Sequence, residues 1–449
     1  MNKKIISFLS TIFIFYSFSF GADVAQNLTP AAQNKKVLTH QDCYNLALSK
    51  NRDFKMAKLD KEISEAQLAK AASSFGPVVN LTAGYQPFYK AFFIEIPAGV
   101  MCPAPVSFPM GTQNYYTMRL SLTQPVFTFG KTFFGYKLAE ESYNIASLNF
   151  KKAKEKLDLD IITAFYGALI SQQLYKITEE SLKRTEEFLK ITQNKYRNGQ
   201  ASNFEVLRAK VELANTKPKV KSAETQYKMA LENLKNAIGI DLDEEIELSG
   251  DINYEKINLV YEDVKKSFIE NNDERKIAQS LENIGQYQKN LSLAMLLPSI
   301  AISANLTNYS TNEAFHREKE YWQNSWDVTI GLQWTIFDSF KNLASVKEAS
   351  LAAEKQKLNR ENMENLLKIQ LDALFMQINE SKEVIEAADE TIKQAEEGYK
   401  IAKTNYVNGL IQSIDLMDAE IMLMQAKMNY LNAMYNYTTK LQTLRNFIK

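Results

Sequence analysis

The chain repeats itself, and this duplication restricts the possible fold more than any other feature of the sequence. A shift of 210 residues aligns the turn sequence Tyr196–Gly199 with Tyr406–Gly409, and it aligns Pro125–Phe127 with Thr335–Phe337. A period this long exceeds that of solenoid repeats. It therefore indicates two copies of one supersecondary unit in a pseudo-symmetric protomer.

The order of segments predicts an exported chain built from two repeats. A basic start followed by the apolar run Ile5–Phe20 is typical of a secretory signal peptide, which we place at 1–21. We expect the first repeat at 22–239, a short acidic linker at 240–258 and the second repeat at 259–449. Each repeat should contain a helix, two β-strands, a long helix and a further helix. No later stretch reaches the ~20 consecutive apolar residues of a membrane-spanning helix.

Four segments alternate strictly between apolar and polar residues, two in each repeat. Segments of about ten residues with one apolar face are typical of tilted transmembrane β-strands, although a soluble β-sandwich is the alternative. The apolar positions are Val79, Leu81, Ala83 and Tyr85; Tyr116, Met118, Leu120 and Leu122; Ile300, Ile302, Ala304 and Leu306; and Trp326, Val328, Ile330, Leu332 and Trp334. We expect Tyr85, Tyr116, Trp326 and Trp334 to form an aromatic girdle at the membrane interface. Four strands cannot close a barrel, and open edges are unstable in lipid, so several chains must share one barrel.

Two proline-free intervals, Lys131–Arg197 and Lys341–Val407, predict one very long helix in each repeat. At ~1.5 Å per residue each would span about 100 Å, which suits a rod or a tunnel wall. Gly199 and Gly409 follow these helices and are expected at turns with positive φ. Pro218 lies inside the next helical segment and should kink or break it.

Composition excludes several function classes. The 53 basic and 53 acidic residues give no net charge, so a nucleic-acid partner is not expected. The two histidines, His40 and His316, lie in unrelated segments, which argues against a metal site or a histidine-based catalytic triad. We expect neither an enzyme nor a cofactor. A disulfide between Cys43 and Cys102 is not expected either, because the two cysteines should lie in different compartments.

Several local sequences resemble the TolC family of outer-membrane efflux proteins. They are Ala71–Pro77 before a strand, Leu120–Phe127 at the end of a strand, and the two Tyr-x-x-Gly turns. The resemblance covers essentially the whole chain after the signal peptide. It implies a mainly α-helical homotrimer in the outer membrane of a Gram-negative bacterium, with a 12-stranded β-barrel in the lipid above a long periplasmic α-helical barrel. It also implies two partners, a periplasmic adaptor (membrane fusion) protein and an inner-membrane transporter of the RND or ABC type.

The resemblance assigns roles to residues near the two turns. Asp415 and Asp418 match an acidic ring at the periplasmic mouth, and their spacing of three places both carboxylates on one helix face. Such a ring would gate the pore, favour cations and be plugged by divalent ions. The alternative is a solvated helix start stabilised by acids.

Two further sets of residues complete the expected mouth. Tyr406 and Glu205 match positions that hold the entrance closed, whereas Ile411 stands where the best-known family member has an arginine. One closing salt bridge is therefore expected to be absent. The turn residues expected to receive the adaptor are Asn198, Gly199, Asn408 and Gly409.

The predicted function is the exit duct of a tripartite efflux or type I secretion system. Drug efflux is the expected class because it is the most frequent in the family, while metal efflux and protein secretion stay open. The segment Phe88–Asn114, with four prolines, is predicted to be the longest external loop. A secreted periplasmic coiled-coil scaffold or adaptor is the alternative function, but it would not explain four alternating strands.

Overall fold

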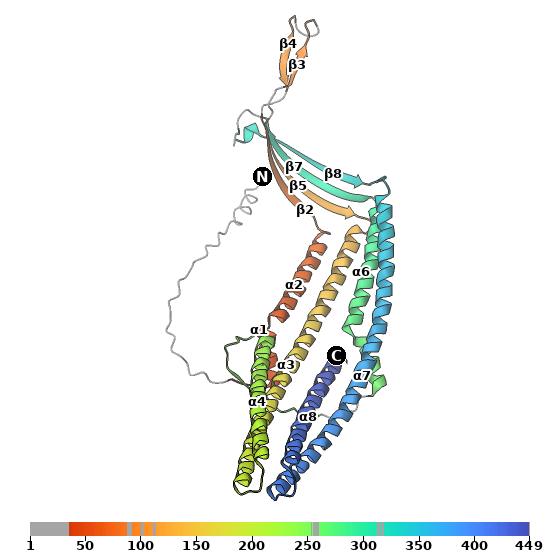
Figure 1. The fold of residues 1–449 in the computed structure, drawn as a ribbon. Helices are drawn as coiled ribbons and strands as arrows, with labels where there is room; N and C mark the ends of the chain where they lie inside the picture. The colour runs from red at the N-terminus through yellow and green to blue at the C-terminus, as the bar shows by residue number, and fades with distance from the viewer. Residues whose placement is uncertain are drawn as a thin grey trace.

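The protomer is elongated, with a curved β-sheet at one end and long antiparallel helices extending from it (Figure 1). The computed structural model describes residues 36–448 apart from 88–91, 100–102, 111–113, 253, 255–259, 312–314 and 316–317. The predicted signal peptide at 1–21 lies outside the described residues, and so do Cys102 and His316.

One antiparallel sheet contains the four predicted strands. Its order is β2-β5-β7-β8, with β2 at Val78–Pro87, β5 at Asn114–Phe127, β7 at Ser299–Ser310 and β8 at Gln323–Gln333. The register pairs apolar positions with one another, and a single row crosses the sheet through Leu81, Leu120, Leu306 and Trp326. The four strands predicted from alternation are confirmed. Strands β2 and β8 are the two edges of the sheet, so it is open in a single chain.

The opposite face of the sheet is polar and hydrogen-bonded. Arg119 on β5 donates from Nε to Thr307 Oγ1 on β7 at 3.2 Å. Asn305 donates from Nδ2 to Asp327 Oδ2 on β8 at 2.8 Å. A sheet with one apolar and one polar face fits a barrel wall between lipid and an aqueous lumen.

The predicted external loop Phe88–Asn114 contains a hairpin of its own. Strands β3 (Phe92–Ile96) and β4 (Val106–Met110) pair antiparallel beyond the end of the main sheet (Figure 1). The connection between β7 and β8 contains a short 3₁₀ turn, η2 (Lys319–Tyr321).

The two long helices have the predicted bounds. Helix α3 covers Lys131–Arg197 and helix α7 covers Lys341–Val407, with 67 residues each. Helices α4 (Asn203–Ile238) and α8 (Ser413–Ile448) run back from the turns, with 36 residues each. In this half of the rod the order of packed helices is α4-α3-α8-α7. The helices of the described chain include none that is both long and apolar enough to cross a membrane.

The single helix expected before the two strands of the first repeat is wrong, because the structure divides it in two. Helix α1 (His40–Lys50) ends at Asn51, and α2 (Arg52–Ser73) begins directly after it. The Asn51 side chain accepts a hydrogen bond from Phe54 N at 2.8 Å and therefore caps α2. Asparagine favours a helix cap over a helix interior because its amide competes for backbone groups.

The second repeat has the same division. Helix α5 (Tyr261–Asn271) and helix α6 (Asp273–Met295) meet at Asn272, which accepts a hydrogen bond from Arg275 N at 3.0 Å. In the half of the rod nearest the sheet, α2 packs on α3, and α6 packs on both long helices. The duplication thus extends to the position of the helix break.

Pro218, where we expected a kink or a break, does not break the helix, because α4 continues through this residue. Proline removes one backbone hydrogen bond, the bond to the carbonyl of Ala214. Pro218 and Ala214 are both exposed, so water can satisfy that carbonyl. The helix therefore tolerates the proline at this surface.

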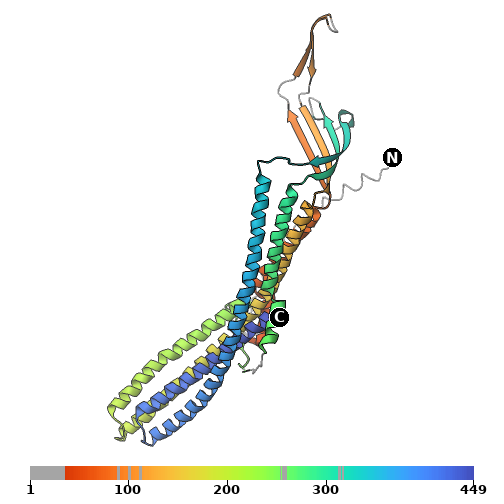
Figure 2. The ribbon, with the colours of Figure 1, turned by 90° about the vertical axis from the view of Figure 1, so that its right-hand side faces the viewer.

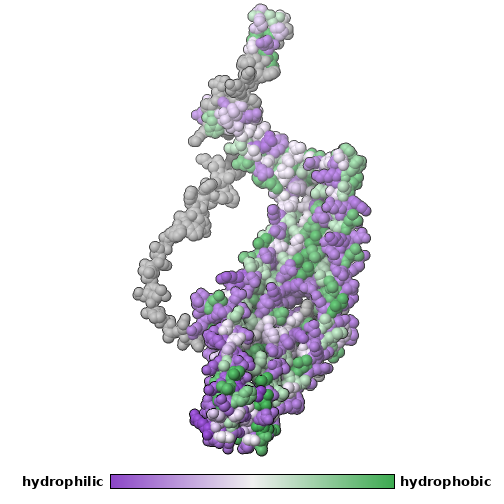
Figure 3. Space-filling view, viewed as in Figure 1, coloured by the Kyte–Doolittle hydropathy of each residue, from purple (hydrophilic) through white to green (hydrophobic). Residues whose placement is uncertain are grey.

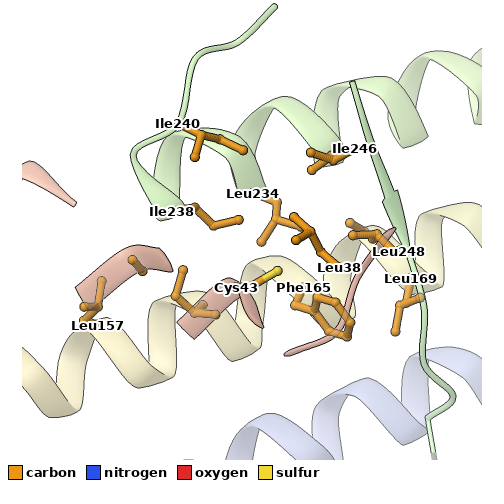
Figure 4. Packing of buried hydrophobic residues seen from close by; sticks show 13 residues of the cluster. Leu38, Cys43, Leu157, Phe165, Leu169, Leu234, Ile238, Ile240, Ile246 and Leu248 are labelled. Carbon is orange, nitrogen blue, oxygen red and sulfur yellow. The ribbon is translucent and has the colours of Figure 1, made fainter. Parts of the chain in front are cut away.

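The predicted linker 240–258 takes part in the equatorial core, the buried cluster halfway along the rod. Strand β6 (Ile246–Leu248) pairs in parallel with β1 (Lys36–Leu38). Cys43 is fully buried among apolar side chains from both segments and from α3 and α4, as Figure 4 shows. Burial raises the pKa of its thiol to about 11. The thiolate needed for reaction is therefore scarce at neutral pH.

Gly239 should be the glycine that least tolerates a side chain. It has φ +84° at the end of α4, and a Cβ there would lie 2.8 Å from Lys50 O. Left-handed strain of ~1–2 kcal/mol adds to a clash of about 1–3 kcal/mol, so Gly239→Ala should lower the free energy of unfolding by roughly 3 kcal/mol. The control is Gly199→Ala, because Gly199 has φ +73° but open space around it. Chemical denaturation in detergent would compare them, and equal losses would exclude the close approach as the cause.

His40 makes the equatorial core sensitive to acid. Its ring packs against Phe165 and Tyr166, its Nε2 is buried without a hydrogen-bond partner, and burial lowers the pKa of the imidazole. A group with a lowered pKa disfavours folding once it is protonated, so stability should fall as the pH drops through about 6.5. Thermal melts from pH 7.5 to 5.5 should show this slope, and His40→Phe should flatten it. An unchanged slope in the variant would assign the effect to another group.

Candidate functional site

Both helical hairpins end in the same kind of turn, at the end of the rod far from the sheet (Figure 2). Gly199 has φ +73° and Gly409 has φ +77°, which confirms the predicted positive φ. In each turn the residue after glycine closes the helix: Gln200 N donates to Lys195 O, and Leu410 N donates to Asn405 O, both at 2.8 Å. This is the Schellman pattern of helix ends.

Asp415 and Asp418 lie at the start of α8 and are both exposed. Asp415 Oδ2 accepts a hydrogen bond from Gln412 N at 2.9 Å, so this carboxylate stabilises the start of the helix. Asp418 lies one turn further on, where the effect of the helix dipole has fallen off. Helix capping therefore accounts for Asp415 but leaves Asp418 without an explanation.

Tyr406 ties the second hairpin to the first. Its side chain is only 2% exposed, and its hydroxyl lies 2.8 Å from Thr192 Oγ1 on α3. The Lys195 ammonium lies 4.4 Å from the centre of the Tyr406 ring and donates to the Tyr406 carbonyl oxygen. Burial, and to a smaller extent the nearby Glu205 carboxylate, raises the pKa of the phenol. Tyr406 thus holds α7 against α3 close to the two turns.

Glu205 does not bond to Tyr406 in the described part of the protomer. Ser202 N donates to Glu205 Oε2 at 2.8 Å, and Glu205 N donates back to Ser202 Oγ at 3.3 Å, which makes a capping box at the start of α4. The sequence Ser-x-x-Glu is a known signal for this arrangement. Ile411 packs against the buried cluster that contains Tyr406, Phe188 and Leu416. Ile411 therefore makes an apolar contact at the position where the best-known family member has an arginine.

Sequence reasoning missed a largely buried ion pair between the two hairpins. Arg184 Nε on α3 lies 2.8 Å from both carboxylate oxygens of Glu420 on α8. The side chains are only 19% and 14% exposed, and burial raises the pKa of Glu420. The Tyr399 ring lies 5.8 Å from the guanidinium, and burial raises the pKa of this tyrosine to about 12. One signal was present: Glu420 interrupts the apolar face of its helix, and a buried charge needs a partner.

A second ion pair joins the same two hairpins nearer the surface. Lys403 Nζ on α7 lies 2.9 Å from Glu187 Oε2 on α3. Together with Arg184–Glu420 and Thr192–Tyr406, it forms a row of polar contacts between α3 and the second hairpin. Any movement of α7 and α8 relative to α3 must break these contacts.

The predicted girdle residues lie at two levels of the sheet, where Tyr85, Trp326 and Trp334 are exposed and Tyr116 is partly buried. The Tyr85 and Tyr116 rings stack with centres 5.0 Å apart, at the end of the strands nearest the external hairpin. Trp326 is 78% exposed on β8, and Trp334, just past the other end of β8, is 53% exposed. Trp334 Nε1 donates to Leu296 O at 3.0 Å. Contact of these rings with lipid stays a prediction.

Solved structures of outer membrane channels have the same fold. The CmeC outer membrane channel of Campylobacter jejuni matches with a TM-score of 0.76 and 17% identity, over 91% of this chain and 85% of that one. The outer membrane protein VceC of Vibrio cholerae matches with 0.75 and 14%, over 91% and 95%. The open-state MtrE outer membrane channel of Neisseria gonorrhoeae matches with 0.74 and 17%, over 96% and 95%. No curated protein sequence matches the chain.

A sequence profile settles the family. The profile described as outer membrane efflux protein matches residues 43–240 and 269–448, one segment in each half of the duplication. These comparisons give no support to the alternative of a periplasmic scaffold or adaptor. The chain belongs to the outer membrane efflux protein family.

Proposed function

We propose that three copies of this chain form the exit duct of a tripartite efflux system, with Asp415 and Asp418 as its acidic mouth. Members of the family are outer-membrane efflux channels that extend into the periplasm, and they work as homotrimers with adaptors and inner-membrane transporters. The observation that supports the trimer is the open sheet with free edges at β2 and β8. Three four-stranded sheets joined at these edges would close a barrel of twelve strands, which removes every edge from the lipid.

The acidic mouth rests on the position of two exposed carboxylates beside the turn of the second hairpin. Each protomer would contribute Asp415 and Asp418, so the trimer would gather six carboxylates around the pore axis. Carboxylate oxygens are the ligands that hard divalent cations prefer. The proposed mouth therefore favours cations and is blocked by divalent ions.

The proposed adaptor site is the pair of hairpin turns, with Asn198 and Gly199 in one and Asn408 and Gly409 in the other. Two large apolar side chains support this, because Phe204 and Leu410 lie beside the turns and are 71% and 72% exposed. Exposed apolar groups of this size are typical of protein contact sites. The transporter is proposed to be of the RND or ABC type.

The duct is tested by electrical recording and its cargo by genetics. The mature protein, reconstituted in a planar bilayer, should give discrete cation-preferring current steps, and folded trimers without such steps would refute the pore.

Deletion of the gene should increase susceptibility to several drugs, with restoration by the plasmid-borne gene. Unchanged drug susceptibility together with lost secretion of an exoprotein would assign the duct to protein export instead.

A further inference from the structure

We infer that the periplasmic half of the trimer is held together by a ladder of ion pairs between lysines on α4 of one protomer and glutamates on α7 of the next. The inference rests on the proposed homotrimer. Helices α4 and α7 are the two outer helices of the order α4-α3-α8-α7, so each has one side without a partner in its own chain. Closing a ring of three protomers brings these two sides together.

The open side of α4 has the sequence pattern of a coiled-coil seam. Its exposed positions with apolar or small side chains follow steps of three, four and seven: Leu207, Val211, Ala214, Pro218, Thr225 and Met229. Beside this seam lies a row of four exposed lysines, Lys210, Lys217, Lys221 and Lys228. Coiled coils place charged residues at such flanking positions and pair them with the neighbouring helix. In the protomer, Lys221 and Lys228 pair with Glu224 on their own helix, at 2.8 and 2.6 Å.

The open side of α7 carries the opposite charge. Four glutamates, Glu383, Glu386, Glu390 and Glu397, follow one another at steps of three, four and seven, and all are exposed. They lie away from the side that packs on the chain's own helices, where Ile378 and Ile385 are each 1% exposed. Lysine and glutamate rows of the same periodicity thus lie on the two helices that the trimer would bring together.

The heights of the two rows match along the rod. The four lysines lie 7, 14, 18 and 25 residues from the first residue of α4, which is Asn203. Glu397, Glu390, Glu386 and Glu383 lie 10, 17, 21 and 24 residues from the last residue of α7, which is Val407. Both helices have one end at the turns, so residue counts from that end give heights along the rod. The heights of each lysine and its glutamate differ by at most three residues, or about 5 Å. Side chains of this length can bridge that difference.

The handedness of the helices also places both rows on the same side of the contact. On a helical wheel with about 100° per residue, the lysines precede the centre of the α4 seam by about 70°, and the glutamates precede the centre of the open α7 face by about 60°. Helix α4 runs away from the turns and α7 runs towards them (Figure 2). Viewed from one end, antiparallel helices turn in opposite senses. The lysine row on α4 and the glutamate row on α7, which are offset by similar angles in sequence order, therefore lie on the same side of the interface.

A second copy of the chain fits this surface better than an adaptor does, because the contact continues towards the membrane. Above the glutamates, α7 exposes Leu351, Leu358, Ile369 and Met376, and the outer helix of the upper half, α2, exposes Met56, Leu59 and Ile63. On the face drawn in Figure 3, apolar patches lie among hydrophilic side chains along the helical rod. The lysine–glutamate ladder would form the lower part of one continuous contact between protomers, apolar above and charged below.

Cross-linking tests the register of the ladder. In a Cys102→Ser background, with Cys43 buried and unreactive, the pair Lys217→Cys and Glu390→Cys should be joined between protomers by a short bismaleimide, giving a covalent trimer in SDS. The control pair Lys217→Cys and Glu383→Cys is offset by ten residues and should give none. A trimeric protein in which the control pair cross-links and the ladder pair does not would overturn the ladder and leave the proposed function standing. A protein that is monomeric throughout would refute the homotrimer itself.

Charge reversal tests the ion pairs. With reporter cysteines at Lys210 and Glu397, reversal of the middle lysines (K217E, K221E) should lower the cross-link yield roughly tenfold at low salt, because like charges then face each other. Reversal of the glutamates (E386K, E390K) should do the same, and combining all four should restore the yield. Restoration separates lost pairing from misfolding. Yields that stay unchanged while adaptor binding weakens would show that the lysine row serves the adaptor and would overturn the ladder.

Discussion

Replacing Asp415 and Asp418 together by asparagine is expected to weaken divalent block of the channel by about 100-fold. At 1.4 kcal/mol per tenfold, this corresponds to roughly 2.8 kcal/mol of lost binding free energy. The change removes all six carboxylates from the proposed mouth, and asparagine offers a divalent ion only neutral oxygens. The helix start should survive, because the amide oxygen of Asn can still accept the hydrogen bond from Gln412 N. Single-channel recording with added divalent ions in the periplasmic-side chamber would measure the effect.

The matched control removes the same charge far from the mouth. Asp241 and Asp243 are exposed in the equatorial segment, so Asp241→Asn with Asp243→Asn should leave block and cation preference unchanged. If the mouth variant keeps the divalent block of the parent, the two acids serve only the helix start. A loss of block in both double variants would point to the overall charge of the protein.

Replacing Arg184 by methionine is expected to lower the free energy of unfolding by about 3–5 kcal/mol, because it leaves the Glu420 carboxylate buried without its partner. The same change should raise the open probability of the pore, since it removes the ion pair that joins α3 to α8 of the second hairpin. The double variant Arg184→Met, Glu420→Leu should recover most of the stability, because a buried pair can be exchanged for apolar groups at little cost. Chemical denaturation in detergent and single-channel recording would measure the two effects separately.

The pH dependence of the free energy of unfolding identifies the cause of the stability loss in Arg184→Met. Burial already raises the pKa of Glu420 in the parent, and without Arg184 it should rise further. A raised carboxyl pKa means that the folded state favours the proton, so the single variant should regain stability as the pH falls. A loss that is the same from pH 8 to pH 5 would assign the effect of Arg184→Met to lost packing instead. The double variant lacks the Glu420 carboxyl and should lose the pH dependence that this group causes.

Most of the architecture could be predicted because it depends on local periodicity. Strict alternation marked strands β2, β5, β7 and β8, and the absence of proline gave the bounds of α3 and α7. The breaks at Asn51 and Asn272 were missed because a single cap residue interrupts an otherwise continuous helical pattern. The β1–β6 pair was missed because three-residue strands have no periodicity and form only when tertiary contacts bring them together.

The candidate site was predictable where a motif marked it and obscure where two distant helices build it. The glycine turns and the acids of α8 stand next to each other in sequence. By contrast, Tyr406 bonds to Thr192, and Arg184 pairs with Glu420, across more than 200 residues of chain. Within the protomer, Glu205 bonds to Ser202 in a capping box, and the role of Tyr406 and Glu205 in holding the entrance closed stays a prediction.

The equal lengths of the paired helices limit how the duct can adapt to the distance between two membranes. Helices α3 and α7 have 67 residues each, and α4 and α8 have 36 each. A longer duct would need insertions of the same size in all four helices, at the same height. Seven residues, about two helical turns and ~10 Å, are the smallest step that returns every side chain to its own seam. An envelope of a different depth would therefore select ducts whose lengths differ in whole steps of this kind, and an insertion in one repeat alone should stop the two turns from meeting at one mouth.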